Sequence, residues 1–198
     1  MTTMWTIVEY FGVITGLIYL VLEFMQKPSM WIVSIINASI YILVYAYTKI
    51  YADMAFYVYN VGISCYGWIL WRKDLDGNKR TDRIKYCNIS VPLLLRAILV
   101  SSILFVAISQ LLIHLTDSLT PYLDAFTTAV SIVASWMTAR RFLEHWIAWS
   151  IVNIASISLY IERNILPTAG LFTIYALVSI LGYIWWRKKG VRVEREKD

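Results

Sequence analysis

Charged residues are scarce in this chain. Asp, Glu, Lys and Arg make up 16% of its 198 residues, whereas a soluble domain contains about a quarter. So little charge cannot cover a water-exposed surface, and this excludes an ordinary soluble globular protein. Cysteine is scarce as well: Cys65 and Cys87 are the two in the sequence, and they lack metal or redox spacing. We expect them to be small packing residues, and we expect no metal and no cofactor.

Apolar residues dominate the chain instead. They make up 59% of it and gather in long runs, and a run of about 20 residues crosses the hydrocarbon core of a membrane. We predict an all-α integral membrane protein that forms a single transmembrane domain over residues 1–198. No basic residue precedes the first run, so we expect no signal peptide there. The seven expected helices are Trp5–Met25, Met30–Thr48, Asp53–Trp71, Leu93–His114, Tyr122–Ala139, His145–Arg163 and Thr168–Trp186.

Prolines and basic residues indicate the boundaries and the orientation of these helices. Each of the four prolines stands at or just before a predicted helix start, where a missing N–H costs nothing. With the C-terminus in the cytoplasm, the outer side receives only Lys49 and Arg163. The inner side receives Lys27, the basic residues between Arg72 and Lys85, Arg140, Arg141 and the tail from Arg187 to Lys197. This bias predicts a protein of the inner (cytoplasmic) membrane with its N-terminus outside. It also accounts for the net charge of +5 without a nucleic-acid partner.

An internal repeat with an offset of 115 residues is the most informative pattern. Sliding residues 31–73 onto 146–188 without a gap matches Trp31 with Trp146, Ser64 with Ser179, Gly67 with Gly182, Trp71 with Trp186, and Arg72-Lys73 with Arg187-Lys188. We predict two three-helix repeats, at about 5–73 and about 122–188. A linker helix at about 93–114 restores the orientation, so the repeats of this 3+1+3 chain are parallel. Parallel repeats occur among transporters, with the substrate site near the midplane where the repeats meet.

Polar side chains recur at helical spacing within several predicted spans. Such residues are costly in a membrane and usually face a cavity or one another. They offer amides, phenols and ring faces but no deep Lys or Arg for a phosphate, which favours a flat heterocycle as the ligand. A structural role, in which an amide ties helices together, is the alternative for each Asn. The candidates for substrate binding are Asn37, Tyr41, Tyr57, Asn60, Trp146, Trp149, Asn153 and Tyr175.

Five short motifs are spread over nearly the whole chain. They are Tyr-Ala-Asp at 51–53, Tyr-Gly-Trp-Ile-Leu-Trp at 66–71, Ser-Ile-Val-Ala at 131–134, Glu-His-Trp-Ile-Ala-Trp at 144–149 followed by Asn153, and Gly-Tyr-Ile-Trp-Trp at 182–186. In these motifs the chain resembles the Pnu-type vitamin transporters, whose best-known members carry nicotinamide riboside. The resemblance implies a SWEET-like fold and facilitated diffusion, with phosphorylation inside the cell trapping the product. It also implies that Trp146, Trp149 and Asn153 line the substrate path. Family members often have Gln where this chain has Tyr57, and related members carry thiamine.

We therefore expect a facilitator for nicotinamide riboside rather than an enzyme. A transporter of thiamine or another flat vitamin is the alternative within this class. A seven-helix receptor is the alternative from another class, although the seventh helix has no Lys for a retinal Schiff base. An intramembrane enzyme is disfavoured because the sequence has no Gly-x-Ser-x-Gly, no His-Glu-x-x-His and no deep His. The expected partners are the vitamin and the lipid bilayer, and a homo-oligomer is compatible with the sequence.

Overall fold

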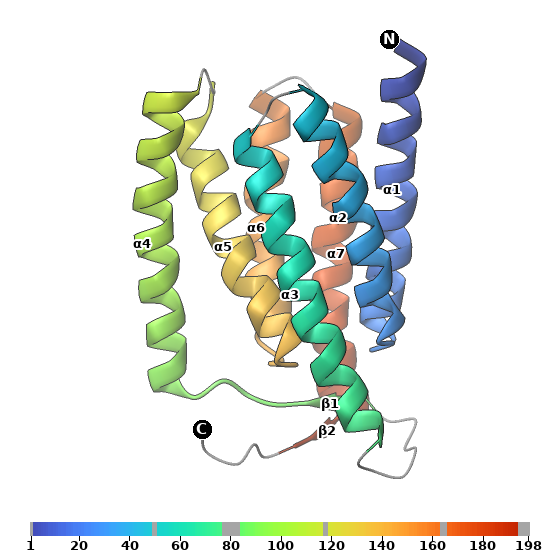
Figure 1. Ribbon diagram of the computed structural model, residues 1–198. Helices are drawn as coiled ribbons and strands as arrows, with labels where there is room; N and C mark the ends of the chain where they lie inside the picture. Colours follow the sequence, from blue (N-terminus) through green and yellow to red (C-terminus); the bar gives the residue numbers. More distant parts are fainter. Residues whose placement is uncertain (1, 49–50, 77–83, 117–118, 163–165, 194–198) are drawn as a thin grey trace. The chain divides into compact units, whose positions relative to one another are not determined.

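Helices form most of the described chain. The computed structural model describes residues 2–48, 51–76, 84–116, 119–162 and 166–193. Within these ranges, seven α-helices and two two-residue strands follow one another (Figure 1). The elements are α1 (Thr2–Phe24), α2 (Ser29–Thr48), α3 (Tyr51–Asp76), β1 (Lys85–Tyr86), α4 (Val91–Leu115), α5 (Pro121–Ala139), α6 (His145–Glu162), α7 (Leu166–Lys189) and β2 (Val191–Arg192). The prediction of seven helices is confirmed.

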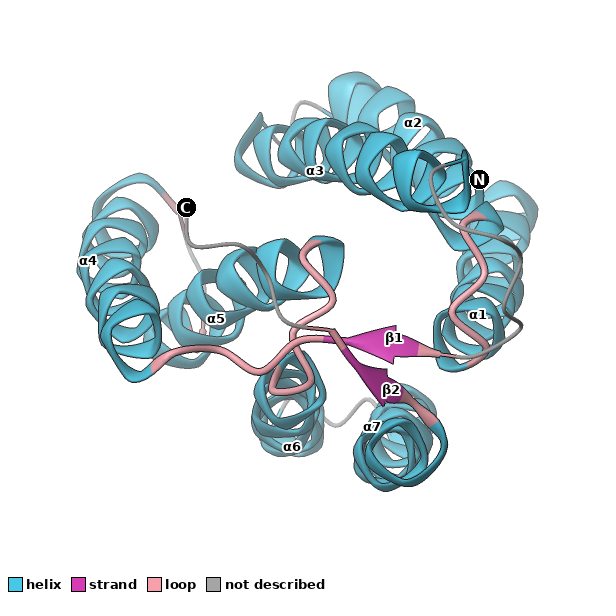
Figure 2. Cartoon of the chain, turned by 90° about the horizontal axis from the view of Figure 1, so that it is seen from below, coloured by secondary structure: helices cyan, strands magenta, loops and turns pink. Residues whose placement is uncertain are grey.

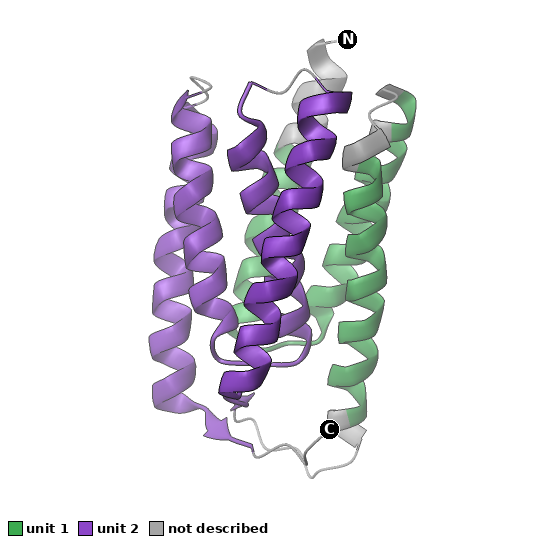
Figure 3. Ribbon diagram, turned by 90° about the vertical axis from the view of Figure 1, so that its left-hand side faces the viewer, with its two compact units in different colours: residues 1–82 green, residues 83–198 purple. Residues whose placement is uncertain are grey.

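The chain folds into two compact units, Met1–Asp82 and Arg83–Asp198, which Figure 3 colours separately. In the first unit, α2 packs against both α1 and α3. In the second unit, α6 packs against both α5 and α7, and α4 packs against α5. In each unit the middle helix of a predicted repeat is therefore the one that contacts both others.

Prolines mark the helix starts as predicted. Pro92 is the second residue of α4 and Pro121 is the first of α5. The carbonyl of Pro28 accepts a 3.1 Å bond from the amide of Trp31 in the first turn of α2. The prediction for the third helix was wrong at its end, because α3 continues beyond Trp71 to Asp76. Arg and Lys are good helix formers, so the helix outlasts the apolar run. Several residues of the charge argument lie outside the described ranges: Lys49, Lys79, Arg80, Arg83, Arg163, Arg195 and Lys197.

Large apolar side chains cover the outside of α4. Leu95, Leu99, Ile103 and Val106 follow at intervals of four, four and three residues and are each more than half exposed, so they form one stripe. A soluble monomer rarely exposes a continuous apolar surface of this kind. Among the described residues, α4 and the segment Thr168–Lys189 of α7 are long and apolar enough to cross a membrane. The 25 residues of α4 extend over about 37 Å at 1.5 Å per residue, which exceeds the hydrocarbon core of about 30 Å.

In each unit, two tryptophans pack against each other between neighbouring helices: α2 and α3 in the first unit, and α6 and α7 in the second. The rings of Trp31 and Trp71 meet edge to face, with centroids 5.5 Å apart and planes at 88°. The rings of Trp146 and Trp186 meet in the same way, at 5.5 Å and 85°. All four side chains are buried. The two pairs occupy positions related by the 115-residue offset, so matched residues make matched contacts.

A short strap at one end of the second unit was not foreseen. Strand β1 pairs with β2 in parallel, and Figure 2, which looks at this end of the unit, shows both strands near the ends of α6 and α7. Next to it, the amide of Cys87 donates to the carbonyl of Arg141 at 3.0 Å. The carboxylate of Glu144 accepts bonds of 3.0 Å from the Asn88 side chain and from the Ile89 amide. These bonds tie the segment before α4 to the turn between α5 and α6.

Candidate functional site

Trp149 and Asn153 lie one turn apart on α6, as their spacing predicts. The indole Nε1 of Trp149 donates to the hydroxyl of Thr138 on α5 at 3.1 Å. The amide Nδ2 of Asn153 donates to the hydroxyl of Ser179 on α7 at 3.2 Å. Asn153 is buried, and Trp149 is half-buried. Each of these two side chains is thus attached to a different neighbouring helix of the same unit.

Trp146 occupies a different environment from Trp149. Its side chain is fully buried, with its ring against those of Trp186 and His145, whose centroids lie 5.5 Å and 4.7 Å away. Its ring also fills the space beside Gly182, where a Cβ atom would come within 2.7 Å of the indole. This residue therefore packs in the interior of the second unit, whereas Trp149 is only half-buried.

Tyr175 belongs to an aromatic row on α6 and α7. Its ring meets Phe172 edge to face at 5.7 Å, and Phe172 stacks on Tyr160 at 5.1 Å with planes 20° apart. The backbone carbonyl of Tyr175 accepts the hydroxyl proton of Ser179 at 2.8 Å. Tyr175 is therefore one turn from the serine that holds Asn153.

The four candidates of the first unit fall into two groups. Tyr41 on α2 and Tyr57 on α3 stack with centroids 4.9 Å apart and planes at 19°. Asn37 donates to the hydroxyl of Thr15 on α1 at 2.6 Å, whereas Asn60 donates to the carbonyl of Phe56 in its own helix at 3.1 Å. All four candidates are half-buried.

Thr15 is a partner that the sequence analysis missed. Its hydroxyl donates to the carbonyl of Phe11 at 2.7 Å and accepts from Asn37. The available signal was its place as a hydroxyl within the first apolar run, one turn beyond Phe11. A single Thr in a span is a weak signal, because its hydroxyl can bond within its own helix.

An apolar cavity of about 610 Å³ lies between α4, α5 and α6, lined among others by Phe105, Val130 and Ile151. None of the eight predicted site residues lines it. The hydroxyls of Ser101 and Ser102 at its wall bond to backbone carbonyls, so they are engaged within the protein. This cavity offers a polar vitamin little to bind and is not the candidate site.

The candidate residues present hydroxyls, amides and aromatic faces. Their side chains carry no charge, and among the described residues no group of three or more His, Cys, Asp and Glu could hold a metal ion. A planar ligand with hydrogen-bonding edges suits this chemistry, because an indole face stacks on the ring and an amide bonds the edge. The helices and this site together define a multi-pass membrane transporter for a small polar molecule.

Sequence and structure comparisons show which family this is. The family model described as nicotinamide mononucleotide transporter matches residues 6–188, and the chain belongs to that family. Its members are transporters rather than enzymes, so this chain is a multi-pass transport protein of the inner membrane.

Three similar proteins illustrate the range of the family. The nicotinamide riboside transporter PnuC of Neisseria mucosa is 31% identical over 184 residues, which cover 88% of this chain and 70% of the relative. The riboflavin/roseoflavin transporter RibM of Streptomyces davaonensis is 26% identical over 182 residues, covering 88% and 82%. The crystal structure of the vitamin B3 transporter PnuC is similar with a TM-score of 0.72 and 28% identity, over 91% of this chain and 80% of that one.

Proposed function

We propose that this protein carries nicotinamide riboside across the inner membrane. The observation that carries the proposal is the Trp149–Asn153 pair, fixed on α6 by bonds to α5 and α7. The similar protein of Neisseria mucosa is named a nicotinamide riboside transporter, which also supports the proposal. Nicotinamide riboside has a flat cationic ring, a carboxamide and ribose hydroxyls, and the pair offers a ring face and an amide for them.

In this proposal the two side chains have different tasks. Trp149 stacks on the pyridinium ring, a contact strengthened by cation–π attraction. Asn153 bonds the carboxamide or a ribose hydroxyl. Trp146 supports the site by packing, and Tyr175 lies one turn from Ser179 on α7. Asn37, Tyr41, Tyr57 and Asn60 of the first unit are, in this proposal, substrate-binding residues as well.

A larger flat vitamin is the second candidate, because one relative is named a riboflavin/roseoflavin transporter. The stacked rings of Tyr41 and Tyr57 present aromatic surface in the first unit, which suits a flat ligand. Thiamine, another flat cation, is a third ligand to compare.

Titration of the purified protein with nicotinamide riboside, thiamine and riboflavin tests the proposal. We expect nicotinamide riboside to bind at least tenfold more tightly than the other two. A preference for riboflavin or thiamine would contradict the proposal and make that vitamin the substrate instead.

The proposed mechanism is facilitated diffusion. The sequence contains no Gly-x-x-x-x-Gly-Lys loop for a nucleotide. We expect liposomes that contain only this protein to take up labelled nicotinamide riboside without ATP until the inner and outer concentrations are equal. Liposomes without protein are the control. Accumulation well above the outside concentration in the absence of an ion gradient would show that the transport is driven.

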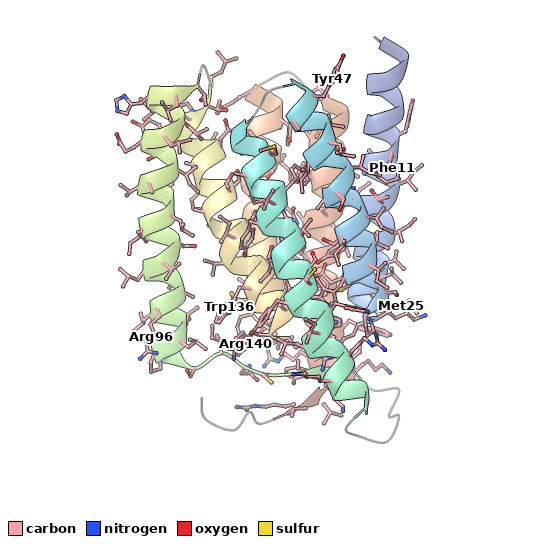
Figure 4. All side chains as sticks on the ribbon, in the orientation of Figure 1. Phe11, Met25, Tyr47, Arg96, Trp136 and Arg140 are labelled. Carbon is pink, nitrogen blue, oxygen red and sulfur yellow. The ribbon has the colours of Figure 1, made fainter. Side chains whose placement is uncertain are left out.

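We further propose that the protein is one transmembrane domain of two parallel three-helix repeats joined by α4, in a SWEET-like 3+1+3 arrangement. Matched contacts support the proposal: the Trp31–Trp71 and Trp146–Trp186 pairs have the same geometry. The N-terminus lies outside and the C-terminus in the cytoplasm. Figure 4 shows Arg96 and Arg140 at one end of the second unit, where basic residues favour the cytoplasmic face.

The proposed topology predicts the outcome of a reporter experiment. A reporter fused after Arg187 is expected to be active only in the cytoplasm, and one fused after Thr120 only outside. The reason is that α5, α6 and α7, three membrane crossings, separate the two points. Reporters that indicate the same side would contradict both the odd number of crossings and the parallel repeats.

A further inference from the structure

Two hydroxyl groups flank α6 in the second unit, one on each neighbouring helix. The hydroxyl of Thr138 on α5 donates to the carbonyl of Ala134 at 3.0 Å, and the hydroxyl of Ser179 on α7 donates to the carbonyl of Tyr175 at 2.8 Å. Each carbonyl lies one turn back in the same helix. Because a hydroxyl has a single proton, both groups can act only as acceptors toward α6. Thr138 and Ser179 are also almost completely buried, at 0% and 1% exposure.

The two side chains of α6 that reach these acceptors are Trp149 and Asn153. An indole nitrogen is always a donor, so the 3.1 Å bond from Trp149 to Thr138 has one direction. The amide of Asn153 could face Ser179 in two ways, and the hydrogen-bond network decides between them. Since Ser179 accepts, Asn153 must present its NH2 group there, at 3.2 Å. Its oxygen Oδ1 then faces away from Ser179 and can act only as an acceptor toward another group.

We propose that Thr138 and Ser179 are positioning residues that fix the ring of Trp149 and the amide of Asn153 for substrate. In this arrangement Asn153 meets the substrate with its carbonyl oxygen, so the substrate group at that point is a hydrogen-bond donor. A carboxamide N–H or a ribose hydroxyl meets this requirement. The inference rests on the proposed function and deepens it, because it assigns the direction of the bond and the residues that set it.

The first repeat contains a natural control for this arrangement. Ser64 occupies the position matched to Ser179 and is equally buried, at 1% exposure. Its hydroxyl bonds Ser34 on α2 at 2.8 Å, and Ala38 stands where the second repeat has Asn153. The serine at this position therefore holds a proposed substrate-binding residue in the second repeat only. A loss of packing or of helix contact would affect Ser64→Ala and Ser179→Ala alike, whereas a loss of positioning would affect only the latter.

The first test measures nicotinamide riboside affinity and thermal stability on the same purified samples. We expect Ser179→Ala and Thr138→Val each to weaken binding about fivefold, which corresponds to about 1 kcal/mol. We expect Ser64→Ala to leave affinity unchanged. Thr138→Ser and Ser179→Thr keep the hydroxyl and are expected to bind within twofold of the unmodified protein. Unchanged affinity in both Ser179→Ala and Thr138→Val would overturn the inference.

Double substitutions separate positioning from a general effect on the fold. Trp149→Phe has no indole N–H, so adding Thr138→Val to it is expected to weaken binding no further. In the same way, Ser179→Ala is expected to add nothing to Asn153→Ala. Additive losses would overturn the positioning role while leaving the proposed site intact. If the unmodified protein itself fails to bind nicotinamide riboside, the proposed function fails, and this inference fails with it.

The direction of the Asn153 bond has its own test. Asn153→Asp keeps an acceptor oxygen for the substrate, whereas Asn153→Ala has none. We expect the aspartate variant to bind nicotinamide riboside at least threefold more tightly than the alanine variant. Equal affinity of the two variants would mean that Asn153 uses its NH2 group toward the substrate, which contradicts the assigned direction.

Discussion

Replacing Gly182 by alanine should lower the melting temperature of the purified protein more than any other single methyl added to α7. A Cβ atom at this position would come within 2.7 Å of one indole carbon of Trp146 and 2.8 Å of two others. Trp146 cannot retreat, because its side chain is fully buried and its ring already meets Trp186 at 5.5 Å. Overpacking of this kind typically costs about 1–3 kcal/mol. The loss outweighs the gain of up to about 1 kcal/mol that alanine brings to a helix interior.

Gly170 on the same helix provides the matched control. A Cβ atom there would meet nothing within 4 Å, so Gly170→Ala should be neutral or slightly stabilising. The first repeat offers the same comparison, since a Cβ atom at Gly67 would clash with the ring of Trp31, whereas one at Gly62 would meet nothing within 4 Å. Thermal melts of the four alanine variants therefore check the prediction twice. Equal melting temperatures for Gly182→Ala and Gly170→Ala would show that the tryptophan ring can move aside.

The spans could be predicted from the sequence because a membrane imposes a simple rule on it. An apolar run of sufficient length must become a helix there, since every backbone group has to be bonded internally. The prolines then locate the starts, as Pro92 and Pro121 do for α4 and α5. Helix ends are harder to predict, because a helix such as α3 extends past its apolar run into polar residues that also favour helix.

Residues matched by the repeat make matched contacts only where both repeats kept the same residue types. The tryptophan pairs and the glycines beside them follow the 115-residue offset. The stacked pairs that involve tyrosine do not follow this offset. Tyr57 stacks on Tyr41, yet its match Phe172 stacks on Tyr160, one turn further along than the residue matched to Tyr41. A position on one helix faces two turns of its neighbour, and the side chains present decide which contact forms.

Hydrogen-bond partners could not be derived from the sequence for a related reason. The sequence offered Asn37, Asn60 and Asn153 as equivalent candidates, with nothing to distinguish them. In the structure they differ, because Asn37 and Asn153 bond hydroxyls on other helices while Asn60 bonds its own helix. The rotation of each helix against its neighbour sets these partners, and the sequence of one helix does not contain that rotation.

Trp149→Ala and Asn153→Ala should each weaken the binding of nicotinamide riboside by about tenfold or more. Stacking of an indole on a cationic ring contributes about 0.5–2 kcal/mol to binding, and the contribution is larger when water is excluded from the contact. Loss of a bond to a neutral group costs about 1 kcal/mol, and more if the ligand group stays buried and unpaired. A change of about 1.4 kcal/mol is a factor of ten in affinity. Trp149→Phe should lose less than Trp149→Ala, because a ring face remains for stacking.

A structural role for the same residues makes a different prediction, and the two can be separated. Trp185 on α7 is 44% exposed, so Trp185→Ala removes an indole of the same size outside the proposed site and should leave affinity unchanged. If Trp149 and Asn153 served only to hold α6 to Thr138 and Ser179, their alanine variants would melt early. Their folded fractions would nevertheless bind normally, because the contacts to the ligand would be intact. Affinity and melting temperature measured on the same samples therefore decide the matter, and normal affinity in a destabilised Asn153→Ala would remove Asn153 from the site.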